Sequence, residues 1–206
     1  MKLDTLRISN FQSFGQEPTE ITFEDISYLI GPNGSGKTST LQAISRLFGF
    51  DPSLRRILKS DFHINPSEET PPLERELWIE ANFLFPELLD EGEHSTIPEF
   101  FNQMRLDSGE DIPRIRYRLE ASMGINGDIE ENLFYILDVD ENNEPISKTL
   151  VPRSDRNQIL AHYLPARRDP SNHIGFGTNA LLGRLLRSIN WDAESEPYRV
   201  CRRLFI

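Results

Sequence analysis

Residues 31–38 combine glycines, a lysine and a threonine at spacings that suit the binding of a phosphate chain. The run Gly31-Pro-Asn-Gly-Ser-Gly-Lys-Thr38 matches the pattern G-x-x-x-x-G-K-[ST] at every fixed position. With glycine at about 7% of residues, a chance match in a chain of 206 residues has odds on the order of one in a hundred. Glycine lets the backbone approach an anion closely, and N–H groups at the start of a helix then point at it.

The residues of this loop have predicted roles toward a nucleoside triphosphate, which we expect to be Mg·ATP. Lys37 is the candidate catalytic residue, because an ammonium between the β- and γ-phosphates neutralises charge that builds there. The Thr38 hydroxyl is the candidate Mg²⁺ ligand, and the Ser39 hydroxyl can hydrogen-bond the α-phosphate. The alternative is a tight glycine turn with an exposed lysine. The predicted cofactor-binding residues are Gly31, Asn33, Gly34, Ser35, Gly36, Lys37, Thr38 and Ser39.

The flanking residues predict the strand and the helix that would hold this loop. Ile26–Ile30 is a short, nearly continuous apolar run, which is typical of a strand covered on both faces. After the loop, apolar residues at helical spacing predict an amphipathic helix: Leu41, Ile44, Leu47 and Phe48. Gly49 then stands where a left-handed C-cap residue is expected.

Alternation of apolar and polar residues predicts strands in most of the remaining chain, and hence an antiparallel sheet with one solvent-exposed face. The predicted strands are Lys2–Ser9, Arg75–Phe85, Arg114–Met123, Leu133–Val139 and Ile146–Val151. Two further strands are predicted on other grounds: Thr19–Phe23 is a short β-prone run, and Ile159–Leu164 is a short apolar run where the chain returns to an α/β pattern. Asp140–Pro145 is rich in turn residues and predicts a hairpin. Leu54–Leu58 could form one or two helical turns, and an amphipathic helix is expected around Leu181–Ile189.

Composition limits the classes of function. The net charge of −11 argues against a nucleic-acid footprint over the whole surface, although a local basic face remains open. The one cysteine, Cys201, excludes an internal disulfide and suits a reducing compartment. No apolar run approaches the roughly 20 residues that span a bilayer, and the N-terminus carries charges where a signal peptide is apolar. We therefore expect a soluble, cytoplasmic protein with no membrane contact.

The order of these elements resembles the heads of ABC-type ATPases. The opening Leu6–Phe14, together with Gly31–Ser39, is similar to the SMC and RecF branch of that group. Tyr163-Leu-Pro-Ala-Arg-Arg-Asp169 and the helix that begins at Gly177 resemble segments of OLD-family ATP-dependent endonucleases, the group that includes the Gabija nuclease. This resemblance spans nearly the whole chain and implies a place in DNA repair or phage defence.

The resemblance implies an α/β P-loop NTPase with an ABC/SMC/RecF-like head, an antiparallel β-rich lobe and an incomplete core. Residues 1–206 would form the N-terminal part of the head: strands, phosphate loop and helix in 1–50, the β-rich lobe in 51–158, and a return to the α/β core in 159–206. Such heads form homodimers around ATP and control DNA cutting. DNA would be reached through regions outside this sequence, and the chain alone would bind ATP but barely hydrolyse it.

Some positions depart from the family pattern. Gln12 stands where the family often carries a basic residue, so a nucleotide contact there is in doubt. Arg7 could serve nearby, but an exposed strand arginine is the preferred interpretation. Gln103 and Gln158 are candidates for the glutamine at the lobe boundary, and neither has supporting context. Arg168 matches the family's arginine before an aspartate, where a salt bridge with Asp169 would also explain it.

Three stretches imitate chemical motifs and are interpreted as decoys. Phe134–Glu141 resembles a Walker B strand, but Val139 rather than an acid follows Asp138, and Asp140-Glu141 enters a hairpin turn. Leu106–Glu110 is followed too soon by Pro113 to open a signature helix. Asp138–Asn142 lacks the glycine and the final glutamate of a calcium loop. The scattered histidines predict surface or packing positions rather than metal ligands: His63, His94, His162 and His173. Arg153–Arg156 with Arg167 and Arg168 could contact DNA, but a solvated charged face is the preferred interpretation.

Two other functions stay open beside the nuclease ATPase. One is a module that binds ATP without turnover and regulates a partner by association. The other is a RecF- or SMC-like DNA-repair ATPase without a nuclease. A Toprim domain further along the gene would favour the nuclease, and a coiled coil would favour the DNA-repair ATPase.

Overall fold

The computed structural model describes residues 1–70, 72–86 and 112–164. The chain divides into two compact units, Met1–Tyr163 and Leu164–Ile206, and every element below belongs to the first. No helix in the described part of the chain is long and apolar enough to cross a membrane. Several predictions concern residues outside the described ranges: Gln103, Leu106–Glu110, His94, Arg167, Arg168, His173, the helix from Gly177 and Cys201.

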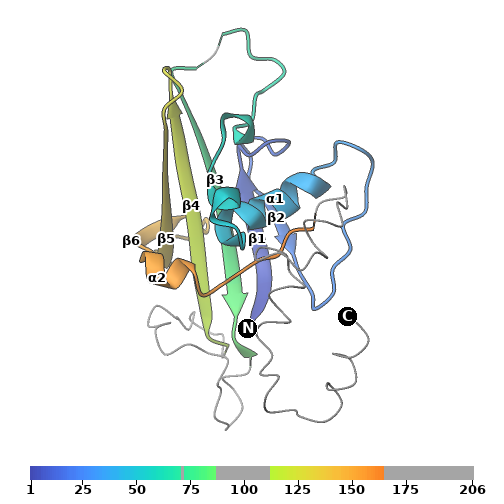
Figure 1. Cartoon of the computed structure of the whole chain (residues 1–206), viewed down its shortest axis with the longest axis vertical. Helices are drawn as coiled ribbons and strands as arrows, with labels where there is room; N and C mark the ends of the chain where they lie inside the picture. The colour runs from blue at the N-terminus through green and yellow to red at the C-terminus, as the bar shows by residue number, and fades with distance from the viewer. Residues whose placement is uncertain (71, 87–111, 165–206) are drawn as a thin grey trace, which may run out of the picture. The chain divides into compact units, whose positions relative to one another are not determined.

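A six-stranded antiparallel sheet forms the described unit, as the alternating sequence pattern predicts (Figure 1). Its spatial order is β2-β1-β3-β4-β5-β6, so the two shortest strands lie at the edges. The strands are β1 (Lys2–Ser9), β2 (Thr19–Thr22), β3 (Glu74–Leu84), β4 (Arg114–Gly124), β5 (Ile129–Val139) and β6 (Pro145–Leu150). Ile79 of β3 lies opposite Ile8 on one side and Leu119 on the other, which places these three on one face of the sheet.

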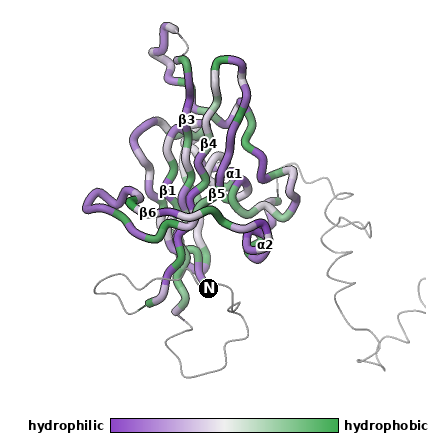
Figure 2. Tube along the Cα trace, turned by 90° about the vertical axis from the view of Figure 1, so that its left-hand side faces the viewer, coloured by the Kyte–Doolittle hydropathy of each residue, from purple (hydrophilic) through white to green (hydrophobic). Residues whose placement is uncertain are grey.

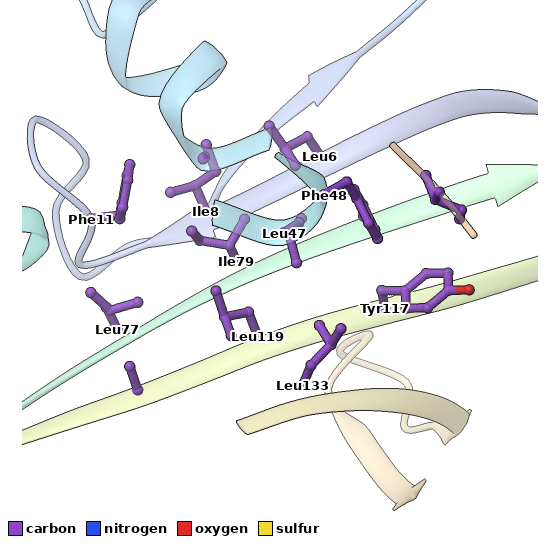
Figure 3. Packing of buried hydrophobic residues seen from close by; sticks show 14 of the residues in the cluster. Leu6, Ile8, Phe11, Leu47, Phe48, Leu77, Ile79, Tyr117, Leu119 and Leu133 are labelled. Carbon is purple, nitrogen blue, oxygen red and sulfur yellow. The ribbon is translucent and has the colours of Figure 1, made fainter. Parts of the chain in front are cut away.

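Helix α1 (Lys37–Phe48) covers that face and forms the core with it (Figure 3). Leu47 and Phe48 are buried against the sheet, and the ring of Phe48 meets Tyr117 edge to face at 5.2 Å between centroids. Leu6 and Leu119 are likewise fully buried. Burying an apolar side chain of this size contributes about 1.5–3 kcal/mol. The helix that starts at the phosphate loop is therefore anchored at its far end.

The opposite face of the sheet is not simply solvent-exposed, which corrects the prediction. Hydrophilic and hydrophobic residues do alternate along the strands (Figure 2). However, Glu80 on this face is buried between Arg7 at 3.4 Å and Arg118 at 3.3 Å. Arg7 is thus a buried, ion-paired arginine rather than an exposed one, so that interpretation is wrong.

The β5–β6 hairpin explains why these charges are buried. Its turn reaches back over the face, and Arg7 Nη1 donates to the Asn143 carbonyl at 2.7 Å. Glu144 pairs with Arg118 at 3.1 Å. Trp78 covers the same cations, with the Arg118 guanidinium 3.9 Å from the centre of its ring. Each buried charge therefore has an opposite charge or an aromatic face beside it.

Three local predictions are wrong. Ile26–Ile30 forms no strand, and Ile26, Tyr28 and Ile30 are exposed, because no described strand pairs with this segment. Gly49 is extended (φ −49°, ψ 133°) rather than left-handed, since the chain turns there into a parallel bridge with Ala161. That single bridge replaces the strand predicted at residues 159–164.

The short helices connect these parts. The helical turns expected at residues 54–58 form only in part. The 3-10 turn η1 (Pro52–Arg55) includes residues 54 and 55, and a second one, η2 (Lys59–Asp61), begins directly after residue 58. Helix α2 (Arg153–Arg156) follows β6. Tyr135 donates to Asp155 of α2 at 3.0 Å, which ties this turn to the sheet. Burial raises the pKa of Tyr135 to about 12, so its hydroxyl stays a donor at neutral pH.

Candidate nucleotide-binding site

The phosphate loop takes the backbone shape that its glycines allow. Gly34 and Gly36 have φ of 86° and 88°, in the left-handed region that favours glycine. A Cβ added at Gly36 would lie 2.8 Å from the Phe14 ring, and one at Gly31 would lie 2.7 Å from Ser35 Oγ. Larger residues would therefore force the loop apart. The glycine pattern that predicted this loop is explained by its geometry.

Helix α1 leaves its first N–H groups available at the loop. Its first backbone hydrogen bond at this end runs from Thr40 N to Gly36 O at 2.8 Å. The N–H groups of residues 37–39 precede this bond and have no intrahelical acceptor. No side chain in the described part of the chain caps the helix, and its first turn contains no acidic residue. The positive end of the helix dipole thus faces the loop without a competing anion.

Lys37 folds back over the loop. Its Nζ donates to the carbonyls of Gly31 at 2.7 Å and Pro32 at 2.6 Å, and lies 3.5 Å from Ser35 Oγ. An ammonium has three donors, and two of them are engaged with these carbonyls. Lys37 therefore holds the loop in shape, and its third and longest hydrogen bond is to the Ser35 hydroxyl.

The two hydroxyls after the lysine differ in their surroundings. Thr38 is exposed, and its hydroxyl has no partner among the residues that the structure describes. Ser39 is buried, and its Oγ lies 3.1 Å from Ser13 Oγ. A magnesium ion fits this arrangement only as part of a nucleotide complex. No cluster of three His, Cys, Asp or Glu residues occurs in the described ranges, so Thr38 would share the ion with phosphate oxygens and water.

Sequence reasoning missed the segment that supports the loop from beneath. Residues 10–15 lie against the loop through Ser13 and Phe14. Gln12, whose contact with a nucleotide was in doubt, donates its side-chain amide to Gln42 and Asp61 instead. Asn10 and Gln12 have positive φ, and a turn of this kind leaves little trace in hydrophobic periodicity. No sequence motif includes Asp61.

The acidic stretch after Leu137 builds a turn. Asp138 Oδ1 accepts from the N–H of Val139 at the end of β5. Asp140 accepts from the N–H groups of Glu144 at 2.8 Å and Asn142 at 2.9 Å, and these bonds hold the pKa of Asp140 below its usual value. The geometry is that of a hairpin, as the sequence predicts.

The remaining candidate residues in the described ranges have structural partners. His63 Nδ1 lies 2.6 Å from the Gln12 carbonyl, and His162 stacks on Phe50 at 4.9 Å. Gln158 is exposed beyond α2. Arg156 corrects the prediction of a solvated charged face, because its Nη2 donates to the Arg46 carbonyl at 3.1 Å and burial lowers its pKa.

Fold and loop together define an ATPase domain of the P-loop class. Residues 1–196 match the family described as AAA ATPase domain, and the chain belongs to that family. The predicted fold class, a P-loop ATPase with an antiparallel β-rich lobe, is therefore confirmed. An ATPase family implies nucleotide binding.

SMC proteins are among the proteins to which this chain is similar. Structural maintenance of chromosomes protein 1 of Caenorhabditis elegans is 34% identical over 83 residues, which are 40% of this chain and 7% of that protein. This chain thus spans less than a tenth of that relative. A solved SMC ATPase, from work on ATP-driven dimerization and DNA-stimulated activation, is 17% identical with a TM-score of 0.41 and covers 99% of this chain and 96% of its own. An Smc head domain of Pyrococcus furiosus, bound to the C-terminal domain of ScpA, is 19% identical with a TM-score of 0.40, over 76% of this chain and 32% of its own. Structural similarities of this size carry no weight for function.

Proposed function

We propose that this chain binds Mg·ATP through residues 31–39 as the nucleotide-binding part of an ABC-type ATPase head. The observation that carries the proposal is the pair of left-handed glycines, Gly34 and Gly36, at the open start of α1. Backbone N–H groups from Asn33 to Lys37 surround the β-phosphate, and Lys37 bridges the β- and γ-phosphates. Thr38 binds Mg²⁺, and Ser39 donates to the α-phosphate. Gly31 and Ser35 complete the wall of the loop.

In the whole protein, two such heads form a homodimer around ATP and couple its hydrolysis to cutting of DNA, as the resemblance to OLD-family endonucleases implies. An SMC-like ATPase without a nuclease is the second candidate, and the 34% identity to an SMC protein favours it. The two are separated by incubating the whole protein with supercoiled plasmid, Mg²⁺ and ATP. Nicked or linear DNA supports the nuclease, while ATP hydrolysis without cleavage supports the SMC-like ATPase.

Titration of a fluorescent ATP analogue with Mg²⁺ tests the loop. We expect Lys37→Ala to weaken binding at least tenfold, about 1.4 kcal/mol, because it removes the charge beside two phosphates. Thr38→Ala should make binding less dependent on Mg²⁺. Asp138→Asn and Glu141→Gln are the matched controls and should bind as the wild type does, since both lie in the β5–β6 hairpin. Equal affinity of Lys37→Ala and wild type rejects the proposal.

The chain alone should release phosphate only slowly. Hydrolysis requires a carboxylate that activates water, and in the described ranges no Asp or Glu side chain forms a hydrogen bond or ion pair with the side chain of Lys37. The Lys37→Ala variant controls for contaminating ATPases. A turnover near 1 per second that this variant abolishes would show a complete active site in this chain, against our expectation.

A further inference from the structure

Asp61 holds a buried carboxylate on which four hydrogen bonds converge. The residue is fully buried. Arg46 of α1 donates Nε to Oδ2 at 2.7 Å and Nη2 to Oδ1 at 3.2 Å. The N–H of Leu58 donates to Oδ2 at 2.9 Å, and the side-chain amide of Gln12 donates to Oδ1 at 2.9 Å. This carboxylate therefore joins α1, the η2 turn and the segment 10–15.

Gln12 is held in an uncommon backbone conformation by the same part of the chain. Its φ is 50°, in a region that a non-glycine residue occupies only when its surroundings impose it. Its N–H donates to the Asp61 carbonyl at 2.7 Å, and its own carbonyl lies 2.6 Å from His63 Nδ1. Its side-chain amide also donates to Gln42 Oε1 at 2.5 Å. Residues 61–63 thus fix both the backbone and the side chain at the centre of the segment.

That segment is the support on which the phosphate loop lies. The next residue, Ser13, meets Ser39 through their hydroxyls at 3.1 Å. Phe14 packs against Gly36 so closely that no Cβ would fit between them. Gly36 and Ser39 belong to the predicted phosphate-binding residues. A shift of segment 10–15 therefore moves an N–H donor and a hydroxyl of the loop.

We propose that Asp61 is a positioning residue for the nucleotide site, and that it acts through Gln12 on segment 10–15 and through Arg46 on α1. The proposal rests on the proposed function of residues 31–39. The hydrogen bonds of the Asp61 carboxylate go to Gln12, Arg46 and Leu58, and none of these residues belongs to the loop. This carboxylate keeps the two supports of the loop, the segment beneath it and the helix behind it, at a fixed spacing before nucleotide arrives. Preorganisation of this kind raises affinity by lowering the ordering cost of binding.

The first experiment is a double-mutant cycle in the affinity for the fluorescent ATP analogue with Mg²⁺. Gln12→Met keeps the length of the side chain and removes its donors, while Asp61→Asn removes the carboxylate. We expect each substitution to weaken binding roughly fivefold or more. Because the contribution of Gln12 depends on its bond to the Asp61 carboxylate, the double variant should bind no more weakly than Asp61→Asn alone. Independent effects that multiply in the double variant overturn the proposal.

A second variant separates positioning from general stability. Gln12→Glu preserves the shape but places a carboxylate against Asp61, with Arg46 and His63 as the other charged or titratable groups facing it. Protonation of the new carboxyl restores a donor to Asp61. The affinity of Gln12→Glu, relative to wild type at the same pH, should therefore recover as the pH falls from 8 to 5.5. Gln12→Met should show no recovery, and parallel pH profiles for the two variants count against the proposal.

The control for lost stability is Tyr135→Phe, which removes the bond to Asp155 and touches nothing near the loop. Below the unfolding transition of every variant, it should bind nucleotide as the wild type does. If Asp61→Asn does not fold, the Gln12→Met variant tests the proposal by itself. The Gln12 side chain is only partly buried, so its replacement should leave the fold intact. If a folded Gln12→Met variant binds nucleotide with wild-type affinity, the positioning role of Asp61 is wrong. The assignment of residues 31–39 as the nucleotide site is then still tested by Lys37→Ala. Absence of binding by the wild type overturns both.

Discussion

Two regions of this chain carry similar strand signals and have opposite surroundings. Strand β3 is an apolar-rich run whose Ile79 and Ala81 are almost wholly buried. Ile26–Ile30 is at least as apolar, yet Ile30 is 93% exposed. The difference lies in their partners. Strand β3 pairs with β4 along its whole length and with β1 over residues 78–84, while Ile26–Ile30 pairs with nothing in the described ranges.

An apolar run in the sequence is therefore not enough to predict a strand. The strand forms only where neighbouring strands are present to pair with it. Strands β4, β5 and β6, which hydrophobic alternation predicts, pair in sequence order as antiparallel neighbours. The phosphate loop lies between the two regions. It is anchored to the sheet through α1, and on its other side it follows the exposed segment. Three substitutions sharpen or break this contrast.

The largest effect is expected in the core beneath α1. Phe48→Ala should lower the free energy of unfolding by about 3–5 kcal/mol, because it empties a buried site between Phe83 and Tyr117. Urea unfolding followed by circular dichroism measures it. Tyr28→Ala in the exposed segment should change this free energy by less than about 0.5 kcal/mol. Similar losses in both variants would show that the two regions are packed alike.

A smaller but still large effect is expected at the buried charges on the opposite face. Glu80→Gln should cost about 3 kcal/mol, because Arg7 and Arg118 would keep their charges without this counter-ion. Glu76→Gln on the same strand is the matched control, since Glu76 is exposed, and its effect should stay within about 0.5 kcal/mol. Equal effects in urea unfolding would mean that this face is solvated, as the sequence pattern alone suggested.

A structural feature can be predicted from the sequence when the residues that form it are close together in the chain. The phosphate loop was predictable because its glycines, Lys37 and Thr38 are adjacent in sequence and each has a defined physical task. Strands β3 to β6 were predictable because alternation with period two reports one buried face. The burial of Glu80 was not predictable, because it requires Arg7 and Glu144, which come from opposite ends of the described unit.

The support beneath the loop was hidden for the same reason. Asp61 lies 15 residues from Arg46 and 49 from Gln12, and no short motif links them. The exposure of Ile30 could not be predicted either, because the sequence shows the apolar side chain and not the absence of a neighbour. The predicted site residues are contiguous along the chain, whereas the contacts that folding brings together, such as those of Asp61, leave no signal in the sequence.

The smallest effect on the free energy of unfolding is expected in the apolar segment Ile26–Ile30. Ile30→Ser should leave the free energy of unfolding within about 0.5 kcal/mol of wild type, because a side chain that is 93% exposed loses almost no packing. The same exchange at Ile79, which is fully buried, is the matched control and should cost at least about 3 kcal/mol. Ile26, Tyr28 and Ile30 expose apolar surface together, so the double variant Tyr28→Ser/Ile30→Ser should also self-associate less in sedimentation velocity. A loss above about 1 kcal/mol for Ile30→Ser would instead show that this segment is packed, and the contrast between the two regions would fail.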